Sequence, residues 1–119
     1  MEDRLRQALE FANYKQTLNN QLQKLKIRVE GSLLFAEAGG KFTINQELIC
    51  FIDYLVRTGL VEATILDDNK SPILIADTSA FLKKITTRYF EVTNDYLQES
   101  KLIKKSRDVK SILDLKVNE

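Results

Sequence analysis

The sequence predicts an α+β domain in which two long terminal helices enclose two β-hairpins and a central helix, in the order α-ββ-α-ββ-α. The first observation is a pair of long terminal segments whose apolar residues recur at spacings of four and three. The second is that short apolar runs of strand length occur in pairs between these segments. The third is that few residues interrupt helices or strands, since the chain has only four glycines and one proline. These five breaks are Gly31, Gly39, Gly40, Gly59 and Pro72.

Residues 2–30 are predicted to form the first long helix, because they contain good helix formers and neither Gly nor Pro. Its apolar residues form one narrow stripe, broken only at Lys15, which we call the seam: Ala8, Phe11, Leu18, Leu22, Leu25 and Val29. Such a stripe must be buried against another surface. At 1.5 Å per residue the helix would measure roughly 40 Å, longer than so small a core, so part of the seam is expected to need a partner.

The first hairpin is predicted from residues 33–38 and 41–44, which flank Gly39-Gly40. This dipeptide suits a two-residue turn with positive φ. In the competing interpretation the first helix continues to Ala38, and Gly39 ends it. We favour the hairpin because Gly31-Ser32 is a poor helix interior.

The central helix is predicted over Gln46–Thr58, with Asn45 as its N-cap and Gly59 at its C-terminal end. Its apolar side chains are distributed around most of the circumference, which is typical of a buried helix. Cys50 lies among them and is interpreted as a small core residue rather than a reactive thiol.

The second hairpin is predicted from residues 62–66 and 73–76, joined by Asp67-Asp68-Asn69-Lys70-Ser71. We interpret these acidic residues as turn formers rather than a cation loop, because the further ligands of a calcium loop are missing. Asp77 is expected to cap a second long helix, over residues 77–104. A looser basic tail, residues 105–119, completes what we expect to be a single domain of 119 residues.

Composition favours packing and partner contact over catalysis. There are 18 basic and 17 acidic residues, so the net charge of +1 offers no strong field for nucleic acid or an acidic membrane. The absence of histidine excludes Ser–His and Cys–His nucleophile pairs. No apolar run approaches the roughly 20 residues that cross a bilayer. One cysteine forms no intrachain disulfide, which suits a cytoplasmic location. We expect no enzyme activity, no cofactor and no metal.

Two surfaces are candidates for binding. The first would face a second copy of the chain or another assembly protein, and comprises Leu18, Leu22, Leu25 and Val29 with Tyr89, Val92 and Tyr96 of the last helix. The second is the basic stretch Lys101, Lys104, Lys105, Arg107 and Lys110, which could contact phosphates in an alternative role as a small nucleic-acid-binding accessory protein. Gly39-Gly40-Lys41 does not have the spacing of a phosphate-binding loop.

The opening segment 4–14, its continuation 17–21, the sequence Gly39-Gly40-Lys41-Phe42 and the segment 45–51 give the chain a resemblance to a known family. Over nearly its whole length it resembles the minor prohead core, or internal scaffold, proteins of T-even-like tailed bacteriophages and their cyanophage relatives. The resemblance implies a non-enzymatic structural protein that joins other core components inside the procapsid, in the host cytoplasm. It also implies removal as the head matures.

Overall fold

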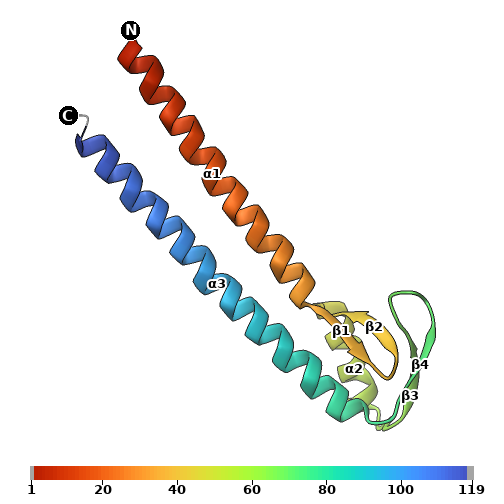
Figure 1. Cartoon of the computed structure of the whole chain (residues 1–119). Helices are drawn as coiled ribbons and strands as arrows, with labels where there is room; N and C mark the ends of the chain where they lie inside the picture. Colours follow the sequence, from red (N-terminus) through yellow and green to blue (C-terminus); the bar gives the residue numbers. More distant parts are fainter. Residues whose placement is uncertain (1, 118–119) are drawn as a thin grey trace. The chain divides into compact units, whose positions relative to one another are not determined.

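A computed structural model describes the backbone of residues 2–117 and the side chains of residues 2–105. The elements follow in the order α1, β1, β2, α2, β3, β4 and α3, which confirms the predicted α+β class and element order (Figure 1). The chain divides into two compact units. One unit consists of the residues up to Arg28 and those from Asp95 onward, and the other of Val29–Asn94.

The first helix, α1, spans Glu2–Ser32, and the hairpin that follows confirms that it does not continue to Ala38. Strands β1, Leu34–Glu37, and β2, Gly40–Thr43, pair antiparallel with Glu37 opposite Gly40. The turn residues are therefore Ala38 and Gly39, with φ of 51° and 84°. Positive φ at both positions is the geometry of the favoured two-residue hairpin turn. The expected Gly39-Gly40 turn is wrong by one residue.

Packing explains why Gly40 belongs to the strand rather than the turn. Gly40 is buried, and a β-carbon added there would lie 2.6 Å from Cγ1 of Ile73. The position therefore requires glycine because of close approach to β4, while Gly39 supplies the positive φ.

Helix α2 spans Gln46–Arg57, and the side chain of Asn45 accepts a hydrogen bond from the N–H of Leu48 at 2.7 Å, as expected of an N-cap. Gly59 follows the helix with a φ of 83°. Only one side of α2 is buried, through Ile52 and Leu55. The interpretation of an almost wholly buried helix is therefore wrong for its outer side. Phe51 and Tyr54 are exposed there, and so is Cys50, which is not a core residue.

Strands β3, Ala63–Leu66, and β4, Pro72–Ile75, form the second hairpin. Each hairpin forms its own two-stranded sheet, so the two hairpins do not join into one sheet. Side chains alternate along β3 and β4, so that Ile65, Ile73 and Ile75 are buried while Leu66 and Leu74 are exposed.

Helix α3 spans Thr78–Val117 and so continues past Lys104, where we expected it to end. Asp77 caps it as predicted, accepting a hydrogen bond from the N–H of Ala80 at 3.1 Å. Buried Thr78 attaches its first turn to the segment after α2, donating from Oγ1 to the carbonyl of Leu60 at 2.5 Å.

The core of the Val29–Asn94 unit lies where both hairpins, α2 and the start of α3 meet. Phe42 of β2 and Phe81 of α3 are both almost fully buried, with ring centroids 5.4 Å apart in an edge-to-face arrangement. The buried members of this core are Phe42, Ile44, Ile52, Leu55, Ile65, Ile73, Ile75, Phe81 and Ile85.

Candidate functional site

Much of the predicted partner surface is occupied by the chain itself. Leu25 is only 3% exposed. The other six predicted interface residues are half-buried: Leu18, Leu22 and Val29 on α1, and Tyr89, Val92 and Tyr96 on α3. The sequence identified the apolar stripes of both helices, but it could not show how much of each stripe the fold would cover.

Within the unit formed by the chain termini, α1 and α3 lie side by side (Figure 1). Arg28 of α1 forms an ion pair with Glu99 of α3. A hollow of about 370 Å³ is lined by Gln21, Lys24, Leu25 and Arg28 from α1 and by Ile103 from α3. Arg28 contacts Glu99, whereas Gln21 and Lys24, which come earlier in α1, line the hollow with Ile103, which comes later in α3. The two helices therefore run antiparallel here. This pairing accounts for the burial of Leu25.

The beginning of α1 is different, because every residue from Glu2 to Asn13 is exposed. Phe11 is 54% exposed and continues the seam, whereas Leu9 is 56% exposed and lies on the opposite side of the helix. Nζ of Lys15 lies 5.1 Å from the centre of the Phe11 ring. The seam is therefore covered from about Thr17 onward and uncovered around Ala8 and Phe11.

The predicted basic stretch falls on α3. Lys101, Lys104 and Lys105 are exposed, and their spacings of three and four residues place them on one side of the helix. Ile103, which lines the hollow against α1, is half-buried. The side chains of Arg107 and Lys110 lie outside the described residues.

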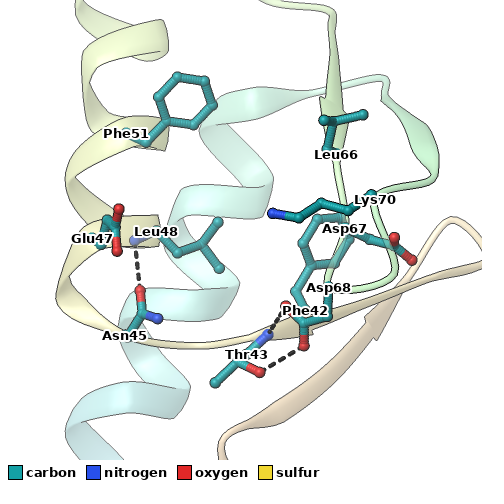
Figure 2. A pocket seen from close by; sticks show the side chains of 10 residues that line it. All are labelled: Phe42, Thr43, Asn45, Glu47, Leu48, Phe51, Leu66, Asp67, Asp68 and Lys70. Atoms are coloured by element: carbon teal, nitrogen blue, oxygen red, sulfur yellow. Dashed lines mark hydrogen bonds between the residues drawn. The ribbon is translucent and has the colours of Figure 1, made fainter.

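A second concave region lies in the Val29–Asn94 unit, between α2 and the turn of the second hairpin (Figure 2). It is an open groove of about 670 Å³. Its walls combine apolar and charged side chains: Phe42, Thr43, Asn45, Glu47, Leu48, Phe51, Leu66, Asp67, Asp68 and Lys70. Figure 2 shows Lys70 extending into the groove toward Leu48. Sequence reasoning missed this groove because the central helix, with Phe51, was interpreted as buried, although Phe51 is exposed. The exposure of Leu66 was not predicted either.

Two adjacent carboxylates form one wall of the groove. Asp67 is 7% exposed, and its Oδ1 accepts hydrogen bonds from the N–H groups of Asn69 at 3.0 Å and Ser71 at 2.9 Å. Its Oδ2 accepts from the N–H of Lys41, in the other hairpin, at 3.1 Å. The N–H donors of Lys41, Ser71 and Asn69 lower the pKa of Asp67 from its ordinary value of 3.8, against the opposing effect of burial.

Asp68 makes the second connection between the hairpins. Its Oδ1 and Oδ2 accept from the N–H of Thr43 at 3.2 Å and the hydroxyl of Thr43 at 2.6 Å. Its own N–H donates to the carbonyl of Lys41 at 2.8 Å. The expected turn bonds are therefore present around Asp67, but the bonds to β2 were not foreseen. No local signal could have revealed them, because they depend on how the hairpins are placed.

Across the residues whose side chains are described, no group of three Cys, Asp or Glu side chains could hold a metal ion. Over the same part of the chain, no helix combines the length and hydropathy that crossing a membrane requires. Comparison with family models, curated proteins and solved structures found no significant match to this chain.

Proposed function

We propose that this chain is a non-enzymatic assembly protein that associates through the uncovered seam at the beginning of α1. The observation that carries the proposal is the change in burial along one stripe. Leu25 is almost fully buried by the chain's own packing, whereas Phe11, on the same side of the helix, is 54% exposed. A helix that packed only within its own chain would have no reason to continue its apolar stripe into solvent.

The proposed partner-facing surface therefore lies closer to the N-terminus than the surface predicted from the sequence. Leu25 is buried where α1 pairs with α3, so its side chain is not available to a partner. Ala8 and Phe11 take its place, because they continue the seam and are exposed. Burying one aromatic or aliphatic side chain contributes about 1.5–3 kcal/mol, so each contact of this kind is weak alone. Assemblies that use many such contacts gain strength from their number.

Within this proposal the assembly is a phage prohead core, and the partners are copies of this chain or other core proteins. The support for that part is the resemblance of segments 4–14, 17–21, 39–42 and 45–51 to minor prohead core proteins. Exposed helical surface and weak repeated contacts suit a scaffold that must assemble and later be removed. The expected location is the interior of the procapsid in the host cytoplasm.

The test is light scattering after size-exclusion chromatography, over a wide range of protein concentration. The parent chain should show a mass that rises with concentration. Phe11→Glu should remove this rise, and Leu9→Glu should leave it unchanged, since Leu9 has similar exposure on the opposite side of α1. A parent mass that stays monomeric at all concentrations, or equal effects of the two variants, would contradict self-association through the seam.

A second candidate function is nucleic-acid binding through Lys101, Lys104 and Lys105. The observation that favours it is that all three lysines are exposed and share one side of α3, which differs from the side of Ile103 that lines the hollow against α1. Binding through phosphates would weaken steeply with salt. Replacing these lysines by Gln should then abolish DNA retention in a low-salt mobility assay, whereas the same changes at scattered Lys26, Lys70 and Lys83 should not. Equal losses would indicate only a general charge effect.

A further inference from the structure

The outer edge of β2 is closed by the turn of the other hairpin. In an antiparallel pair, alternate residues point their N–H and C=O groups away from the partner strand. Lys41 and Thr43 occupy such positions, since the hairpin's closing pair is Glu37 with Gly40. Edge groups of this kind ordinarily bond to water or invite another strand. Here they bond to Asp67 and Asp68.

The two acidic residues satisfy the edge as a third strand would. The N–H of Lys41 donates to Asp67 Oδ2, and its carbonyl accepts from the N–H of Asp68. The N–H of Thr43 donates to Asp68 Oδ1, and its hydroxyl donates to Oδ2 of the same carboxylate. Three consecutive outward-facing backbone groups of β2 are therefore occupied by one two-residue segment.

We propose that Asp67 and Asp68 form a latch, which closes the edge of β2, and that neutralising the Asp67 carboxylate opens it. Release would leave the outward N–H groups of Lys41 and Thr43 without these acceptors. It would also remove one wall of the groove, next to Phe42, which is only 2% exposed when the latch is closed (Figure 2).

The hydrogen-bonding pattern makes the two carboxylates unequal. In Asp67→Asn, one oxygen becomes an NH₂ group, yet all three groups that face the side chain are N–H donors, from Lys41, Asn69 and Ser71. Either orientation of the amide places a donor against a donor. In Asp68→Asn, the remaining oxygen accepts from the N–H of Thr43, and the new NH₂ group donates to the Thr43 hydroxyl, which can also accept. Asp68→Asn is therefore a matched control that removes the same charge.

Latch opening can be followed by amide hydrogen exchange, resolved by residue. Asp67→Asn should accelerate exchange at Lys41 and Thr43 by roughly tenfold or more, the effect of losing a hydrogen bond to a charged acceptor. Asp68→Asn should change it much less. The N–H of Ile44, which donates to Leu33 across the hairpin, reports on the hairpin itself and should change little in either variant.

Equal acceleration at Lys41, Thr43 and Ile44 would indicate general loosening, and equal effects of the two variants would indicate charge alone. Either result would overturn the latch. The parent chain gives an independent test if Asp67→Asn does not fold. In the parent chain, the N–H groups of Lys41 and Thr43 should exchange far more slowly than those of Leu34 and Ala36. The N–H groups of Leu34 and Ala36 point away from β2, along the outer edge of β1. Comparable rates would show that the latch is not closed in solution.

Discussion

Gly40 of β2 lies so close to Ile73 of β4 that a β-carbon on the glycine would be 2.6 Å from Cγ1 of the isoleucine and 2.9 Å from its Cδ1. Ile73 is itself buried and cannot withdraw without disturbing the core. The contact joins the two hairpins at a point where position 40 has no room for a β-carbon. The absence of a side chain at position 40 is thus a packing requirement.

Gly40→Ala should accordingly destabilise the protein by about 1–3 kcal/mol, the usual cost of overpacking a core. Gly31→Ala is the matched control, because a β-carbon at Gly31 meets nothing within 4 Å and the residue lies in α1. That change should instead stabilise by roughly 0.5–1 kcal/mol. Urea unfolding followed by circular dichroism measures both. A neutral Gly40→Ala would mean that Ile73 moves aside freely.

The turn at Ala38 offers a stabilising substitution. Ala38 has a φ of 51°, in the left-handed region that disfavours residues with a β-carbon. Ala38→Gly should raise the free energy of unfolding by about 0.5–1 kcal/mol, since glycine adopts this conformation without steric cost. The same change at Ala36, inside β1, should lower stability because glycine weakens a strand. Two changes of the same sign would contradict the assigned turn.

Thr78 should contribute to stability through its hydroxyl group. The side chain is 1% exposed and donates to the carbonyl of Leu60. Thr78→Val keeps the shape but leaves that carbonyl without this donor, so a loss of roughly 1–3 kcal/mol is expected. Thr64→Val, at an exposed position of β3, should be neutral or slightly stabilising. Thermal unfolding of the two variants would show whether the hydroxyl acts as described.

Acid should weaken the fold partly through Asp67. Because the folded-state pKa of Asp67 lies below its ordinary value of 3.8, the carboxylate contributes stability at pH values above 3.8. This contribution decreases as the pH falls below 3.8 and through the folded-state pKa. Asp67→Asn should therefore remove part of the pH dependence of stability in this acidic range. Denaturant titrations at several acidic pH values measure the free energy of unfolding of both proteins. If it fell equally with pH in the parent and in Asp67→Asn, the N–H donors would not stabilise the charged form of Asp67.

Signals carried by neighbouring residues predicted the elements well. Asn45 and Asp77 were identified as helix caps from sequence, and the structure shows the hydrogen bond that each accepts from its helix. The position of Gly59 after α2 was equally clear, because a positive φ at a helix end is a local property. In these cases the interaction lies within a few residues of the signal.

Features that depend on distant residues could not be predicted. The predicted position of the first turn was wrong by one residue because Gly40 packs closely against Ile73, which lies in the other hairpin. Phe51 was placed in the core because its helix is apolar on most sides, yet burial depends on what the fold supplies to cover each side. The same reason explains why the seam was recognised but its covered and uncovered parts were not distinguished.

The ammonium group of Lys15 over the Phe11 ring has a consequence for partner choice. Lys15 occupies a seam position, so any helix that covers Phe11 also meets a positive charge beside it. Such a helix must offer a carboxylate or a free carbonyl at that level, or leave the charge desolvated at considerable cost. A single charged residue at a seam position is known to fix the register of paired helices. In the proposed assembly, the seam is therefore expected to favour partner helices that carry a hydrogen-bond acceptor beside Lys15 over wholly apolar ones.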